Sequence, residues 1–380
     1  MQINNKHHHL YAQLDVPPRL LLGPGPSNAH PRVLQAIGMR QLSHLDPAFT
    51  ALMDEIQELL RYTWQTDNEY TISISGTGSA AMEAAVANSV EPGDVILVGV
   101  MGYFGERLVE MAKRYGGDVR IIEKAWGEVF TPEDIRVALE THQPAVLMLV
   151  HAETSTGALQ PLEGIGDLCS QHNCLLLTDC VTSLGAAPLS VDEWGIDIAY
   201  SCSQKGLSCP PGASPLTYGP RALAKLDKRK QPTPNWYYDL TLLHNYWGGS
   251  PRSYHHTMSS NMNYALREGL RLVAEEGLQA RWQRHQATAQ LLWDGLAELG
   301  LSCHVADPGL RIPSLTTVRV PDGVDAKDVA QRLLKEYNIE IAGGFSKLAG
   351  KVWRVGLMGS NSRPENVLTL LAALNEILNR

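Results

Sequence analysis

Between residues 70 and 218, short apolar runs alternate with segments of helical periodicity, and this alternation constrains the fold more than any other feature of the chain. Continuous apolar strands separated by helices are typical of a mostly parallel sheet that is covered on both faces. Strands are expected at residues 70–75, 95–100, 119–122, 145–150, 174–179, 196–201 and 214–218. Helices are expected between them, at residues 78–90, 104–115, 132–140 and 162–172. The pattern predicts an α/β fold around a seven-stranded sheet.

The two ends of the chain differ from this central region. Residues 1–22 are expected to form an irregular arm ending in Leu20-Leu21-Leu22, and residues 47–64 have helical spacing. Beyond Trp247, further elements are expected: a long helix at 261–298 interrupted near Gly277, strands at 314–320 and 352–357, and helices at 326–337 and 363–378. We therefore predict an arm (1–22), a large domain (23–278) and a small C-terminal α+β domain (279–380).

Charge and composition exclude some classes of function. The chain has 380 residues, a hydrophobic content of 44% and a net charge of −8. Nucleic acids and membrane surfaces both favour basic faces, so neither is expected as a partner, and no segment is long enough to span a membrane. An anionic ligand would have to be held by local donors.

The cysteines and the N-terminus indicate the compartment. Six cysteines show neither a CxxC pair nor a zinc-type spacing, so we expect a reducing compartment and no metal site. Residues 1–13 lack the apolar stretch of a signal peptide, and a cytoplasmic protein is expected. His7, His8 and His9 are expected to belong to a solvated arm.

Lys205 and Asp179 are the two residues that point most directly to chemistry. Lys205 lies just past one predicted strand, and Asp179 ends the strand before it, which would place an amine and a carboxylate in one crevice. Pyridoxal 5′-phosphate needs that pair, since an amine forms the Schiff base and an acid keeps the pyridine nitrogen protonated. The alternatives are a solvated loop lysine and an aspartate that caps the next helix.

A glycine turn after residues 70–75 is a candidate phosphate site. The hydroxyls of Thr77 and Ser79, together with the first amides of the helix that begins near Gly78, could donate to an anion. The turn lacks the Gly-Lys-Ser/Thr ending of a nucleotide loop and the third glycine of a dinucleotide fingerprint. It suits a monophosphate, although such turns are more often simple connections.

Three more positions could contact the ring of such a cofactor. Phe104 lies beyond the strand 95–100 and could stack on a flat ring, with a core aromatic as the alternative. Thr154 could hydrogen-bond the phenolate oxygen, or it belongs to a capped turn. Val181 would pack against the face of the ring.

These motifs together resemble the class V aminotransferases of fold type I, specifically the alanine–glyoxylate / serine–pyruvate aminotransferase group. The resemblance runs from Gly23 to the C-terminal helix. It is carried by Ser75-Gly76-Thr77-Gly78, Gly102-Tyr103-Phe104-Gly105-Glu106-Arg107, His151-Ala152-Glu153-Thr154-Ser155-Thr156-Gly157, Thr178-Asp179-Cys180-Val181, Ser203-Gln204-Lys205-Gly206, Tyr254-His255-His256-Thr257 and Val352-Trp353-Arg354-Val355-Gly356. The chain departs from the family pattern at Phe104 and Ser79, where the relatives carry tryptophan and histidine.

For the cofactor, the resemblance implies an aspartate aminotransferase-like fold that binds pyridoxal 5′-phosphate. Lys205 would form the Schiff base and Asp179 would contact the pyridine nitrogen. Thr77, Gly78 and Gln204 would hold the phosphate, while the part played by Ser79 is less defined.

For the substrate, the resemblance implies that Arg354 binds the carboxylate bidentately and that Gly25 lines the same pocket. Tyr254 and Thr257 would reach the cofactor phosphate of a neighbouring subunit, which predicts a homodimer. The implied reaction is a ping-pong transamination between alanine or serine and glyoxylate or pyruvate.

Two alternatives to this reaction stay open. One is another pyridoxal phosphate reaction on the same fold, such as a cysteine desulfurase or a lyase; Cys303 lacks the glycine-rich setting of a desulfurase cysteine. The other is a catalytically silent binding protein, against which the presence of Lys205 argues.

Overall fold

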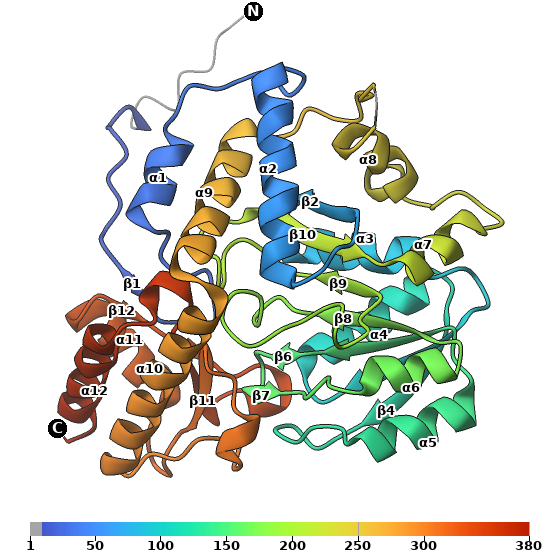
Figure 1. Ribbon diagram of the computed structural model, residues 1–380. Helices are drawn as coiled ribbons and strands as arrows, with labels where there is room; N and C mark the ends of the chain where they lie inside the picture. The colour runs from blue at the N-terminus through green and yellow to red at the C-terminus, as the bar shows by residue number, and fades with distance from the viewer. Residues whose placement is uncertain (1–9, 250, 380) are drawn as a thin grey trace, which may run out of the picture.

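A seven-stranded sheet lies at the centre of the computed structural model, which describes residues 10–249 and 251–379 (Figure 1). Its strands are β2 (Tyr70–Gly76), β3 (Val95–Val100), β4 (Asp118–Glu123), β5 (Val146–Val150), β8 (Leu175–Asp179), β9 (Ile198–Tyr200) and β10 (Gly212–Tyr218). They lie in the order β2-β10-β9-β8-β5-β3-β4. Pairing is parallel from β9 to β4, whereas β10 is antiparallel to both of its neighbours. The predicted α/β fold with a mostly parallel seven-stranded sheet is confirmed.

Helices cover the sheet, with α2 and α9 in front of it and α3 and α4 behind it in the view of Figure 1. The helices of this region are α2 (Pro47–Trp64), α3 (Gly78–Ser89), α4 (Tyr103–Arg114), α5 (Pro132–His142), α6 (Ile165–Gln171) and α9 (Ser260–Glu276). Every residue of β5 and β8 is buried, as the continuous apolar runs required. The described helices include none that is both long and apolar enough to cross a membrane.

A second, smaller unit follows α9. It contains α10 (Leu278–Glu298), β11 (Leu315–Arg319), α11 (Ala326–Glu336), β12 (Ile339–Glu340), β13 (Ala342–Gly343), β14 (Val352–Gly356) and α12 (Pro364–Leu378). Its sheet has β14 between β11 and β13, and both pairings are antiparallel. Gly277 adopts a φ of +81° between α9 and α10, so the predicted interruption of the long helix is confirmed. The exact division at residue 278 stays a prediction.

The end of the N-terminal arm is not irregular, and in this respect the sequence prediction was wrong. Leu20 and Leu21 form β1 (Leu20–Leu21), which pairs in parallel with β12. Leu22 is fully buried in the hydrophobic cluster of the small unit. A two-residue strand has no visible periodicity, and its partner lies more than 300 positions away in the sequence. Residues 1–9, with His7, His8 and His9, lie outside the described residues.

Several short elements had no signal in the sequence pattern. They are α1 (Pro31–Ile37), α7 (Pro220–Asp227), α8 (Leu240–Trp247), β6 (Ala152–Glu153), β7 (Ala158–Leu159) and the 3-10 turns Trp236–Tyr238, Pro308–Leu310, Ser346–Leu348 and Gly359–Asn361. None exceeds eight residues, which is too short for helical or alternating periodicity to stand out.

Candidate active site

Lys205 lies in the loop that follows β9, at the carboxyl edge of the central sheet. Its side chain is half-buried, and Nζ donates a hydrogen bond to the carbonyl oxygen of Pro24. Burial lowers the pKa of Lys205 from its ordinary value of 10.5; Arg354 acts in the same direction, and Cys202 and Asp179 act against it. A lowered pKa favours the neutral amine, which is the form that attacks an aldehyde.

The segment around Gly25 lies directly against Lys205. A Cβ added to Gly25 would lie 2.5 Å from Cδ of Lys205 and 2.6 Å from its Nζ, and Gly25 has a φ of +107°. Ser27 holds the same loop, since its amide donates to the carbonyl of Gln204 at 2.9 Å and its hydroxyl to the carbonyl of Lys205 at 3.0 Å. Gly25 therefore lines the space around the amine, and only glycine leaves room there.

Asp179 ends β8 and lies opposite Tyr200 in the register of the sheet. Its Oδ1 accepts a hydrogen bond from the amide of Val181 at 2.8 Å, and its Oδ2 accepts one from the hydroxyl of Tyr200 at 2.7 Å. Burial raises the pKa of Asp179 to about 6, against the effect of these hydrogen bonds. The segment directly after Asp179 is not a helix, since residues 181–186 form turns. The alternative that Asp179 caps the next helix was therefore wrong.

The start of α3 has the properties of an anion site. Thr77 is the N-cap residue, but its side chain makes no capping hydrogen bond, so the first amides of the helix remain open to a ligand. A Cβ added to Gly78 would lie 3.1 Å from Cβ of Cys202 and 3.4 Å from Cγ2 of Val181. The helix start therefore lies close to the segments that follow Asp179 and precede Lys205.

Two further side chains border this end of the site. The side-chain oxygen of Gln204 is buried without a hydrogen-bond partner, an arrangement that a ligand or water would complete. Ser79 is exposed, and its hydroxyl accepts a hydrogen bond from Nη1 of Arg107 at 3.3 Å. These features fit pyridoxal 5′-phosphate: the open amides at the start of α3 suit its phosphate, and Lys205 and Asp179 suit its aldehyde and ring nitrogen. The unpaired side-chain oxygen of Gln204 leaves a hydrogen-bonding position for the ligand.

Phe104 lies in the first turn of α4, and a residue that the sequence analysis did not single out holds it there. Glu153 is fully buried, and its Oε2 accepts hydrogen bonds from the amides of Phe104 at 3.0 Å and Gly105 at 3.3 Å. Burial raises the pKa of Glu153 to about 7. The guanidinium of Arg107 lies 4.9 Å from the centre of the Phe104 ring. An acid close to the carboxyl end of an apolar strand was the signal that could have identified Glu153, which comes three positions after β5, much as Asp179 ends β8.

Arg354 reaches the site from β14 of the small unit. It is buried, its Nε donates to the carbonyl of Gly343 at 2.8 Å, and its Nη1 donates to the carbonyl of Thr154 at 3.5 Å. Its guanidinium lies 4.0 Å from the centre of the Phe345 ring, a contact that the sequence did not suggest. Burial lowers the pKa of Arg354 to about 10, with Glu153 acting against the shift. The structure thus brings Arg354 and Thr154 together.

Tyr254 and Thr257 lie apart from this group. Both are exposed, and their hydroxyls are 3.4 Å from each other. In the described part of the chain, neither side chain is bonded to Lys205, Asp179 or Arg354. The neighbouring His256 contacts the hydroxyl of Ser75 at 2.6 Å, which places the segment near the end of β2. The predicted role of these two residues in a partner's site stays a prediction.

Comparison with known proteins identifies the family. Residues 21–363 match the family described as aminotransferase class V. The chain belongs to this family. As a class V aminotransferase it is a pyridoxal phosphate-dependent enzyme of fold type I, which confirms the family, cofactor and fold predictions.

Three relatives of this aminotransferase are similar over nearly their whole length. An alanine–glyoxylate aminotransferase from Nostoc sp. has 62% sequence identity and a TM-score of 0.98, with all of both chains covered. A ureidoglycine–glyoxylate aminotransferase from Bacillus subtilis has 41% identity and a TM-score of 0.95, covering 97% of this chain and 95% of its own. An alanine–glyoxylate aminotransferase from Callithrix jacchus is 46% identical over 371 residues, which are 97% of this chain and 90% of the relative.

Proposed function

We propose that this class V aminotransferase transfers the amino group of alanine to glyoxylate, with serine as a second donor and pyruvate as a second acceptor. The observation that carries the proposal is that Arg354 is buried and donates to the carbonyl of Thr154, at the same edge of the sheet as the Lys205 loop. A carboxylate bound by this guanidinium would bring the Cα of a short substrate to the amine.

The names of the relatives support glyoxylate more strongly than they support the donor. Two of the three are alanine–glyoxylate aminotransferases, and the third is a ureidoglycine–glyoxylate aminotransferase. Glyoxylate therefore occurs in all three names, whereas the donor differs. We accordingly propose glyoxylate as the acceptor and alanine as the donor favoured by two of the relatives.

The roles of the residues follow from their positions. When bound, pyridoxal phosphate supplies an aldehyde for the substrate amine and a ring that withdraws electrons from the substrate Cα. Lys205 would take the proton from the Cα of the amino donor and pass it to the carbon that carries the cofactor's aldehyde group, and in the second half-reaction it would move a proton in the opposite direction, to the Cα of the acceptor. Asp179, with its raised pKa, gains a charge partner when the ring nitrogen is protonated. Arg354 orients the carboxylate of both substrates.

The remaining residues hold the cofactor. Phe104 and Val181 would contact the two faces of the ring, and Thr154 would lie near its phenolate oxygen. The first amides of α3, with Thr77, Gly78 and Gln204, would bind the phosphate, and Ser79 borders that end.

An assay of the purified protein tests the proposal. After incubation with pyridoxal phosphate, alanine and glyoxylate, pyruvate and glycine should appear in equal amounts. Lys205→Ala should abolish the reaction together with the visible absorbance band that borohydride removes from the wild-type protein. If no small donor yields its 2-oxo acid, the proposed function is wrong.

The surroundings of Cys303 disfavour the desulfurase alternative. Cys303 is partly buried and forms a β-bridge with Val318, and burial raises the pKa of its thiol. A desulfurase needs a thiolate that can reach the substrate. A silent binding protein is disfavoured by the amine of Lys205, which is half-buried and whose pKa is lowered.

We also propose a cytoplasmic homodimer. The exposed hydroxyls of Tyr254 and Thr257 support a contact with the partner subunit's cofactor phosphate. Sedimentation should give the mass of two chains, and Tyr254→Phe should weaken cofactor binding without changing that mass. A monomer with full activity would contradict the proposed dimer.

A further inference from the structure

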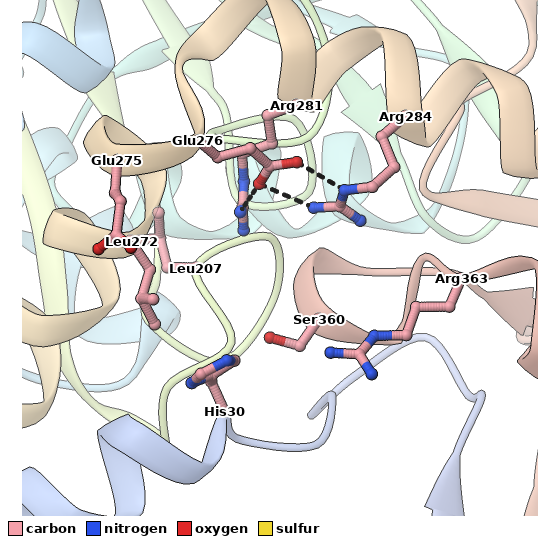
Figure 2. A pocket seen from close by; sticks show the side chains of 9 residues that line it. All are labelled: His30, Leu207, Leu272, Glu275, Glu276, Arg281, Arg284, Ser360 and Arg363. Atoms are coloured by element: carbon pink, nitrogen blue, oxygen red, sulfur yellow. Dashed lines mark hydrogen bonds and ion pairs between the residues drawn. The ribbon is translucent and has the colours of Figure 1, made fainter.

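Glu276, the last residue of α9, lies between two arginines of α10 (Figure 2). Its Oε2 accepts from Nη1 of Arg281 at 2.6 Å and from Nη2 of Arg284 at 3.0 Å, and its Oε1 accepts from Nε of Arg284 at 2.6 Å. Burial acts to raise the pKa of Glu276, but the two arginines outweigh it and the pKa lies below its ordinary value. The carboxylate is therefore charged and holds both guanidinium groups.

Arg281 connects this carboxylate to the loop of Lys205. Its Nη2 donates to the carbonyl of Gly206 at 2.6 Å, and its Nε donates to the carbonyl of Gly185 at 2.7 Å. Gly206 directly follows Lys205, and Arg281 is only 5% exposed. The position of the lysine loop therefore depends on where Arg281 is held.

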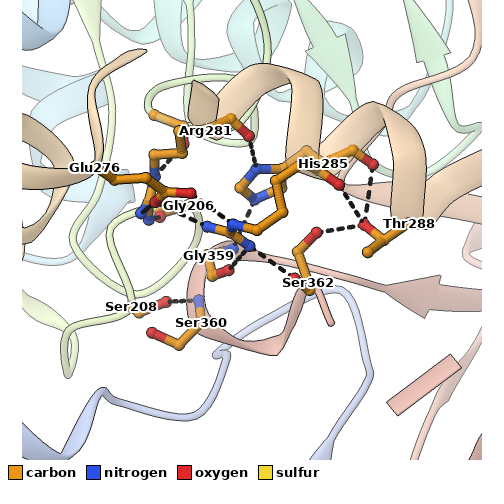
Figure 3. A network of polar contacts seen from close by, with 11 residues as sticks. Gly206, Ser208, Glu276, Arg281, His285, Thr288, Gly359, Ser360 and Ser362 are labelled. Atoms are coloured by element: carbon orange, nitrogen blue, oxygen red, sulfur yellow. Dashed lines mark hydrogen bonds and ion pairs between the residues drawn. The ribbon is translucent and has the colours of Figure 1, made fainter. Parts of the chain in front are cut away.

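Arg284 connects the same carboxylate to the turn that follows β14, the strand of Arg354. Its Nη1 donates to the carbonyls of Gly359 at 3.0 Å and Ser362 at 2.7 Å. The two loops also meet directly, since the amide of Ser360 donates to the hydroxyl of Ser208 at 2.7 Å (Figure 3). One carboxylate thus joins the segments of the amine and of the carboxylate-binding arginine.

A cleft of about 410 Å³ lies beside this cluster, but the two arginines do not make it an open anion site. Every guanidinium nitrogen of Arg281 and Arg284 donates to an oxygen of the protein. The cluster therefore stabilises the protein's own backbone.

We infer that Glu276 is a positioning residue for the transamination, acting through Arg281 and Arg284 to hold the Lys205 loop against the segment of Arg354. The inference rests on the proposed function, because both groups must meet one substrate. A substrate whose carboxylate lies on Arg354 presents its Cα to Lys205 only if the two segments keep their spacing. A displacement of about 1 Å at a reacting centre can cost about a hundredfold in rate.

Glu276→Gln and Glu275→Gln form a matched pair of variants. Glu275 is the adjacent acid, but it pairs with Arg32 and Arg271 on the surface and its side chain is 56% exposed. We expect Glu276→Gln to lower kcat/KM for alanine and for glyoxylate by at least about tenfold, mainly through kcat, because the Cα of a bound substrate is no longer held at Lys205. Glu275→Gln should stay within about twofold of the wild type. Equal kinetics of the two variants, or a Glu276→Gln protein with unchanged kcat, would overturn the inference.

Hydrogen exchange of the cofactor-free protein gives a readout that does not depend on activity. In Glu276→Gln, residues 206–208 and 359–362 should exchange faster than in the wild type, while β5 and β8 keep their protection and show that the chain is folded. Glu275→Gln should exchange like the wild type, and Arg284→Gln replaces Glu276→Gln if the latter does not fold. Unchanged exchange of the two loops overturns the inference. An inactive wild-type protein would count against the proposed function alone, and the exchange result would still decide the role of Glu276.

Discussion

The carboxyl groups of Asp179 and Glu153 at the edge of the central sheet accept hydrogen bonds from amides and hydroxyls, whereas Glu276, at the junction of α9 and α10, accepts from two guanidinium groups. Burial raises the pKa of Asp179 to about 6 and that of Glu153 to about 7. The pKa of Glu276 is lowered, because its two arginines outweigh its burial. Hydrogen bonds from neutral donors do not offset the free-energy cost of burying a charged carboxylate, whereas hydrogen bonds from guanidinium groups stabilise the charged form.

At the sheet edge, a ligand would have to supply the positive charge that the buried carboxyl group lacks. At Glu276, the chain itself supplies that charge. Asp179 would gain from a protonated ring nitrogen, which is the charge that pyridoxal phosphate can bring. Glu276 already has its charge partners within the chain. Replacing Asp179 should therefore lower activity without destabilising the chain, whereas replacing Glu276 should lower both activity and stability.

The largest effect is expected for Asp179→Asn. Loss of the charge opposite the ring nitrogen should lower kcat by about a hundred- to a thousandfold, the cost of removing one preorganised electrostatic partner. The cofactor-free protein should melt at no lower temperature than the wild type, since asparagine can still bond the amide of Val181 and the hydroxyl of Tyr200. Steady-state kinetics and thermal unfolding measure the two quantities. If Asp179→Asn were strongly destabilised but had normal activity, Asp179 would stabilise the fold and not the reaction, and the contrast with Glu276 would be wrong.

The next effect is the pH dependence of the cofactor-free protein. The pKa of Asp179 is raised from 3.8 to about 6, so between these values the folded chain holds a proton that the unfolded chain has released. Stability is therefore lost as the pH rises through this window, by about 3 kcal/mol in full. In denaturant unfolding, the free energy of unfolding of Asp179→Asn should rise relative to that of the wild type from about pH 4 to about pH 7. A difference that does not change with pH would contradict the raised pKa.

Glu276→Gln should be destabilised by about 2 kcal/mol, less than the cost for a fully buried pair because Glu276 and Arg284 are partly exposed. The lowered pKa gives the opposite pH dependence: the stabilisation is present above the ordinary pKa of 4.5 and is lost as the pH falls through the folded value. Urea unfolding at neutral and acidic pH tests both statements, with Glu275→Gln as control. A larger loss at acidic than at neutral pH would show that the carboxylate is not the stabilising form.

The smallest effect is expected for Tyr200→Phe, which removes one neutral donor from Asp179. One hydrogen bond of this kind contributes about 1 kcal/mol to the free energy of unfolding. Activity should fall less than in Asp179→Asn, because the carboxylate itself remains. Comparing the two variants in the same assay measures how far Asp179 depends on its neutral donors.

Much of the fold was predictable because its buried strands are long enough to appear in the sequence as continuous apolar runs. The runs at 95–100, 145–150 and 174–179 read as continuous apolar segments since both faces of the sheet are covered. Asp179 ends one of these runs and Lys205 closely follows the run at 196–201, so both could be assigned to one edge. The short helix α7 and the strand β1 gave no such signal.

The sequence by itself determined the sheet, the order of the motifs and the family, because these depend on local patterns and on residue types at defined spacings. Only the tertiary structure decided that β1 pairs with β12, that Glu153 holds the start of α4, and that Glu276 joins the loop of Lys205 to the segment of Arg354. The physical reason is that these contacts join residues far apart in the chain. Their hydrogen bonds and charges depend on distances that a linear pattern does not contain.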